Sequence, residues 1–192
     1  VSKIYRIVEE ESKAGRTVII VGNAAHPEVR GIRGWSGENT YVVGSIEEAN
    51  NKKFRFTLTT NGILLNDEIL DFANKEMSNI VLSIDGRKEI NDLMRPTRNN
   101  HGSSYDIIMP KFKKIADSRN QMNYYVRGTF THNNLDFSKD VLSLADLGYK
   151  QISVEPVVAD ESEDYALREE DLPKIYEEYD KLAVEMIKRE KE

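Results

Sequence analysis

The chain has 192 residues, of which 39% are hydrophobic and 31% charged, and its formal net charge is −6. This composition is typical of a globular protein with one or two domains, and the acidic balance argues against a nucleic-acid partner, because phosphate binding needs clustered Lys and Arg. The absence of cysteine excludes disulfides, thiolate zinc sites, cysteine nucleophiles and an iron–sulfur cluster held by the chain's own thiolates. The longest apolar runs are too short to span a membrane and the first residues lack the apolar core of a signal peptide, so a cytoplasmic location without a membrane partner is expected.

In chain order, the sequence first predicts a helix over 2–14, which ends at Gly15, and then a β-branched strand over 16–22. A second strand, 40–45, and a short helix, 45–51, follow. From there strands and helices alternate regularly. The predicted strands are 54–62, 79–86, 123–131 and 151–158, and the predicted helices are 66–76, 103–119, 136–148 and 171–192, the second of them with a kink at Pro110.

This alternation predicts an α/β fold of about six βα units with parallel strands, arranged as a partial (β/α)6 barrel or an open sheet. Two segments are expected, 1–51 and 52–192, sharing one sheet. The loops 95–104 and 159–170 are expected to be flexible. The last helix is expected to turn a stripe of four residues toward the core: Tyr176, Tyr179, Leu182 and Met186. An exposed edge strand could support an oligomer.

Polar residues follow the strands at their carboxyl ends, where ligands bind in parallel α/β folds. They are Asn23 and His26, Thr60 and Asn61, Ser83 and Asp85, Arg127 and Thr129, and Glu155. Asn61 and Asp85 each precede glycine, so both can also be read as turn residues. Arg127 and Glu155 are charged residues within apolar runs and are expected to face a cavity or a partner.

Other polar residues favour structural roles. His101 and His132 lie in polar loops, and with His26 they lack the helical spacing of a metal site, so solvent-facing loop histidines are expected. The acidic stretch 159–171 is interpreted as a solvated loop and helix start. No metal site is predicted.

The string "HPEVRGIRGW", together with the leading "VSKIYR" and the run "TVIIVG", resembles the middle portion of 4-hydroxy-3-methylbut-2-enyl diphosphate reductase. In that family the histidine and glutamate of the string bind the substrate diphosphate and relay a proton. The resemblance would place His26 and Glu28 in these catalytic roles, here as remnants, because the three cysteines that bind the family's cluster are missing.

Residues from about 52 to 192 resemble a different family, the radical S-adenosylmethionine maturases that install thioether links in six-cysteine peptides. The resemblance rests on strings such as "FRFTLTTNGILLNDEILDFANKE" and "YYVRGTFTHNNLDFSKDVLSLADLGYKQISVEPVV". It implies contacts to S-adenosylmethionine from Thr60, Asn61, Ser83, Asp85 and Arg127, and a substrate-facing Glu155. The CxxxCxxC cluster loop of that family has no counterpart.

The two resemblances together suggest a chimera, in place of a natural protein of single lineage. Three functions remain open on the sequence alone. The first is a scaffold without catalysis that retains weak binding of S-adenosylmethionine or of a small phosphate ligand. The second is part of a working enzyme whose cluster is supplied elsewhere, and the third is a structural or interaction module.

Overall fold

The structure, a computed structural model, describes residues 21–23, 55–98 and 101–190. The chain divides into two compact units, one comprising residues 1–60 and 65–81 and the other residues 61–64 and 82–192. The predicted elements 2–14, 40–45 and 45–51 lie outside the described residues, as do His26 and Glu28.

The strands of the sheet follow chain order, β1-β2-β3-β4-β5, with helices between them. In the first unit β1 (Val21–Asn23) pairs in parallel with β2 (Thr57–Thr60). In the second unit β4 (Tyr124–Phe130) pairs in parallel with β5 (Ile152–Pro156). The predicted α/β class with parallel strands is therefore confirmed.

The first unit also holds α3 (Asp67–Glu76), which leads to β3 (Asn79–Ser83). Asn66 lies just before α3 and its side chain accepts a hydrogen bond from the amide of Ile69 at 2.9 Å, as expected of an N-cap. Leu70 and Ala73 are the buried residues of the helix. Helix α3 agrees with the predicted helix 66–76 to within one residue.

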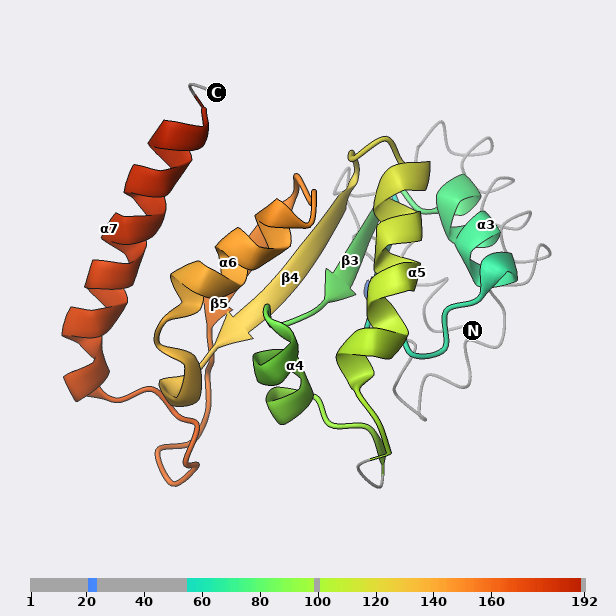
Figure 1. The fold of residues 1–192 in the computed structure, drawn as a ribbon. Coiled ribbons are helices and arrows are strands. Elements are labelled where there is room, and N and C mark those ends of the chain that lie inside the picture. The colour runs from blue at the N-terminus through green and yellow to red at the C-terminus, as the bar shows by residue number, and fades with distance from the viewer. Residues whose placement is uncertain (1–20, 24–54, 99–100, 191–192) are drawn as a thin grey trace, which may run out of the picture. The chain divides into compact units, whose positions relative to one another are not determined.

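The second unit contains α4 (Lys88–Met94), α5 (Ser104–Ser118), α6 (Phe137–Asp146) and α7 (Leu172–Arg189). Two short 3₁₀ turns, His132–Asn134 and Glu169–Asp171, precede α6 and α7. In Figure 1, α6 lies along β4 and β5, and α5 lies beside β3. None of the helices in the described ranges is long and apolar enough to cross a membrane.

The core of the second unit lies between β4 and the helices. Alternate residues of β4 are buried, which is the period of two that a strand with one covered face requires. The buried apolar residues include Leu82, Ile84, Ile108, Phe112, Ile115, Tyr124, Val126, Phe130, Phe137 and Leu144. The intervening residues of β4 leave a more polar face toward the other side of the sheet.

Two expectations about helices need correction. Helix α4 was not predicted, because it is short and its N-terminal Arg87 makes no side-chain cap. The stripe predicted to face the core on α7 is correct only in part. The Tyr179 ring packs against Phe137, with ring centroids 4.9 Å apart, and Leu182 is half-buried. Tyr176 and Met186 are wrong, because each is 63% exposed, and the buried residues of the helix are Ile175 and Glu178. The buried Glu178 carboxylate accepts hydrogen bonds from Ser138 and Lys181, and these bonds permit a charged residue to occupy the inward face.

Candidate functional site

The more polar face of β4 and β5 carries the charged pair that the sequence singled out. Arg127 and Glu155 form an ion pair through Nη2 and Oε2, and each side chain is 49% exposed. The register places Arg127 beside Ser153 and Thr129 beside Glu155. Each charge thus has the other as its partner, and both remain accessible to a ligand.

Asp85, at the end of β3, occupies a different environment. Its side chain is 4% exposed, and Arg95 donates to both carboxylate oxygens, from Nε at 2.7 Å and from Nη2 at 2.9 Å. The amide of Thr129 also donates to Asp85 Oδ1 at 2.9 Å, and the amide of Asp85 donates to Asn91 Oδ1. The carboxylate is thus held by groups of this chain, in a bidentate arginine pair that fixes its orientation.

These contacts bring three strand ends together within the second unit. The amide of Ile84 donates to the carbonyl of Arg127 at 2.9 Å, which joins the end of β3 to β4. Asp85 bonds to Thr129, and Thr129 lies beside Glu155 on β5. Asp85, Thr129 and Glu155 therefore form a row across three strands, and the Arg127 side chain joins the row through Glu155. The ligand roles of these residues stay predictions.

The remaining predicted residues lie at strand ends as well. Asn61 is exposed, and its side chain accepts a hydrogen bond from the amide of Ile63 at 3.3 Å, which is the turn geometry expected of Asn before glycine. Thr60 is buried at the end of β2 and belongs to the first unit. Ser83, at the end of β3, is half-buried.

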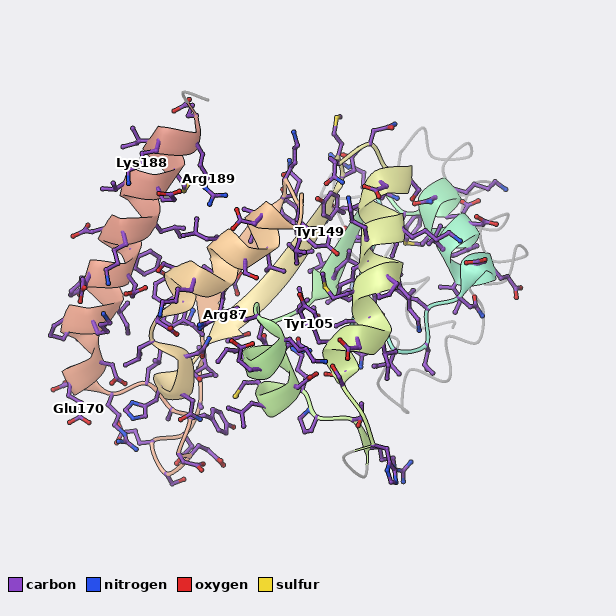
Figure 2. The ribbon with its side chains drawn as sticks, in the orientation of Figure 1. Arg87, Tyr105, Tyr149, Glu170, Lys188 and Arg189 are labelled. Atoms are coloured by element: carbon purple, nitrogen blue, oxygen red, sulfur yellow. The ribbon has the colours of Figure 1, made fainter. Side chains whose placement is uncertain are left out.

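Sequence reasoning missed a second arginine–carboxylate pairing next to Asp85, here called the Arg87 clamp, in which Arg87 binds Asp136 and Asp140. The Arg87 guanidinium donates to Asp140 at 2.7 Å and to Asp136 at 2.7 Å, and the Arg87 amide also donates to Asp140. The hydrogen bond with Asp140 raises the pKa of Arg87 against its partial burial, and Asp136 adds to the effect. Burial raises the pKa of Asp136, but the hydrogen bonds from Arg87 and Lys139 outweigh burial and lower it. Figure 2 shows Arg87 beside the N-terminal end of α4.

Gly86 makes this clamp possible. Its φ is +126°, a conformation that L side chains rarely adopt, and an added Cβ would lie 2.2 Å from Cβ of Asp140. The sequence signal that could have revealed the clamp is the Asp-Gly-Arg run at the strand end, but its acidic partner is 53 residues away along the chain.

His132 is not a solvent-facing loop histidine as expected. Its Nδ1 lies 2.9 Å and 3.0 Å from the two oxygens of Asp171, which is 4% exposed. Its amide donates to the carbonyl of Tyr165 at 3.1 Å. Together these bonds tie the loop that follows β5 to the end of β4. His101 is exposed, as predicted.

The family model for the LytB protein matches residues 1–110, more than half of the chain. The chain belongs to the LytB protein family. The match confirms the first resemblance and extends it well past residue 50, through α3, β3 and α4.

Curated relatives of this LytB family member are named 4-hydroxy-3-methylbut-2-enyl diphosphate reductase. The protein of Caldanaerobacter subterraneus subsp. tengcongensis is 48% identical over 54 residues, which are 28% of this chain and 19% of that protein. The protein of Alkaliphilus oremlandii is 28% identical over 112 residues, which are 56% of this chain and 38% of that protein. The chain thus spans only about a fifth of the length of its more similar relatives.

Some solved structures have a fold similar to that of this LytB-family chain. A histidine-tagged anSMEcpe with bound AdoMet superposes with a TM-score of 0.63 at 17% identity, covering 76% of this chain and 40% of that one. Native anSMEcpe with bound AdoMet and the Kp18Cys peptide gives 0.62 at 18% identity, covering 74% and 41%. At this identity the likeness shows the fold alone, which agrees with the α/β fold of parallel strands predicted from sequence.

Proposed function

We propose that the chain is a chimeric α/β scaffold that binds S-adenosylmethionine weakly at Arg127 and Glu155 and holds no iron–sulfur cluster of its own. Two findings support a chimera. The match to the LytB family model ends at residue 110, whereas the fold neighbours named with AdoMet cover about three quarters of the chain.

The donor set does not fit an iron–sulfur cluster. Such clusters are held mainly by cysteine thiolates, and the chain has no cysteine. Within the described ranges, no group of three or more His, Asp or Glu side chains is arranged to hold a metal ion.

The accessible ion pair is the observation that carries the binding proposal. The methionyl end of S-adenosylmethionine has a carboxylate and an ammonium group, which match the guanidinium of Arg127 and the carboxylate of Glu155. An exposed ion pair contributes about 1 kcal/mol or less, so exchanging it for two ligand contacts costs little. Asp85 supports this surface by fixing the amide of Thr129 beside Glu155.

Titration calorimetry with S-adenosylmethionine tests the proposal. We expect weak binding to the wild-type chain and at least tenfold weaker binding to Arg127→Ala, which is about 1.4 kcal/mol. Arg189→Ala is the matched control, because Arg189 also forms an exposed ion pair, with Asp146 on α6. Absence of heat with the wild-type chain, or equal binding by Arg127→Ala and Arg189→Ala, would overturn the proposal in favour of a structural or interaction module.

A second candidate ligand, a diphosphate, is favoured by the 48% identity to the reductase. His26 and Glu28 would contribute an imidazole and a carboxylic acid to that site, as the resemblance implies. Inorganic pyrophosphate is the probe, with His26→Ala as the variant. Binding that is lost in His26→Ala and kept in Arg127→Ala would assign the diphosphate to the first segment.

A further inference from the structure

The face of β4 and β5 that holds the Arg127–Glu155 pair also carries a second pair of side chains. The odd-numbered residues of both strands lie on this face, because alternate residues of β4 are buried and Val154 of β5 packs against the apolar side. An amide of β4 donates to the carbonyl of Gln151 at 2.9 Å, so the ladder between the strands continues to this residue. The register therefore places Tyr125 beside Gln151, two positions before Arg127.

The functional groups of Tyr125 and Gln151 have no partner among the residues that the structure describes. The Tyr125 side chain is 43% exposed, and within the described ranges it makes no ring contact and no hydrogen bond. Gln151 is half-buried, and its side-chain amide has no hydrogen bond to any other described residue. Tyr124, the next residue on the buried face, instead donates to Gln121 and packs against Tyr149. An aromatic ring and a carboxamide are thus available together on the polar face.

An aromatic ring beside a carboxamide suits the recognition of adenine. Bases stack on aromatic side chains whatever their identity, because every base has a π-face. A glutamine carboxamide adds selectivity, since it accepts from N6 of adenine and donates to N7. Hypoxanthine has a carbonyl oxygen in place of the N6 amino group, so it offers two acceptors and cannot form the same pair.

We infer that Tyr125 and Gln151 form a subsite for the adenine base of S-adenosylmethionine, with the base stacked on the tyrosine ring and its N6–N7 edge bonded to the glutamine. The inference rests on the proposed function, which assigns the methionyl end of the same ligand to Arg127 and Glu155. Residues two positions apart in a strand are separated by about 6.6 Å, so the base and the methionyl group bind at neighbouring positions of one sheet face.

Adenosine and methionine are the probes, because each carries one end of the ligand. In titration calorimetry with the full chain, we expect Tyr125→Leu to weaken adenosine binding at least tenfold, whereas Tyr125→Phe retains the stacking ring and binds as the wild type does. Methionine should bind equally to all three. Tyr176→Leu is the matched control, because Tyr176 is an exposed tyrosine on α7. Circular dichroism confirms that each variant is folded.

Inosine tests the role of Gln151, because its base is hypoxanthine. We expect the wild-type chain to bind adenosine at least fivefold more tightly than inosine, and Gln151→Leu to bind the two alike. Absence of heat with adenosine, equal adenosine binding by Tyr125→Leu and Tyr176→Leu, or an unchanged preference in Gln151→Leu would overturn the subsite.

Methionine separates failure of the subsite from failure of the proposed function. If methionine binds and Arg127→Ala weakens it while adenosine gives no heat, the subsite is wrong and the methionyl assignment stands. If adenosine binds through Tyr125 while methionine gives no heat, the subsite stands as a nucleoside site and the methionyl assignment to Arg127 and Glu155 is wrong.

Discussion

Replacing Arg95 by alanine would leave the Asp85 carboxylate buried without its guanidinium partner. Breaking a buried ion pair by removing one member costs about 3–5 kcal/mol. Here the Arg95 side chain is 34% exposed and the amide of Thr129 still donates to Asp85, so we expect a smaller loss of about 2 kcal/mol. Asp85→Asn should cost less, about 1 kcal/mol, because an amide oxygen can still accept from Thr129 and Arg95 can turn to water.

Urea unfolding monitored by circular dichroism measures both values. The double variant, which combines Arg95→Ala with Asp85→Asn, should be no less stable than Arg95→Ala alone, because it leaves no buried charge without a partner. Arg98→Ala is the control, since Arg98 is exposed and lies three residues further along the chain. If Arg95→Ala is as stable as Arg98→Ala, or if Asp85→Asn costs more than Arg95→Ala, the pair does not hold the end of β3 as described.

Three further changes probe the second unit. Hydrogen bonds from Lys181 and Ser138 overcome burial and lower the pKa of Glu178 to about 2. The stabilisation that this carboxylate contributes, at most about 3 kcal/mol, is therefore complete above about pH 4.5 and is lost as the pH falls toward 2. Glu178→Gln should flatten the fall in urea stability between these pH values, and an unchanged profile would contradict this. Gly128→Ala should lower the free energy of unfolding by about 1–3 kcal/mol, because an added Cβ would lie 2.6 Å from the carbonyl oxygen of Ile84. Each kcal/mol corresponds to a fall of about 2–4 °C in melting temperature. An unchanged melting temperature would show that β3 and β4 can separate freely. His132→Ala should speed hydrogen exchange in the loop 157–168 through loss of the bond to Asp171, and equal exchange rates would refute that anchoring role.

Local sequence signals predicted most of the helices and strands in the part of the chain that the structure describes. The residues Asn66 and Gly148 marked helix ends that the structure confirms, and Gly148 has the positive φ of a helix-terminating glycine. The strand predicted over 123–131 likewise corresponds to β4, Tyr124–Phe130. These signals succeed because each depends on neighbouring residues in one element.

The errors came from contacts between distant segments. The exposure of Tyr176 on α7 could not be predicted, because helical spacing shows that an apolar stripe exists but not whether another element covers it. The burial of Glu178 could not be predicted either, because it depends on a hydrogen bond from Ser138, which lies 40 residues earlier in the chain. The Arg87–Asp140 clamp also joins two elements that sequence spacing does not relate.

Anaerobic reconstitution with iron and sulfide tests the central claim, that this chain supplies binding surface but no cluster ligands. After removal of unbound metal by gel filtration, we predict no iron or acid-labile sulfide eluting with the chain, while binding of S-adenosylmethionine is the same before and after treatment. Iron and sulfide in stoichiometric amounts with the purified chain, together with the visible absorbance of a cluster, would contradict the account.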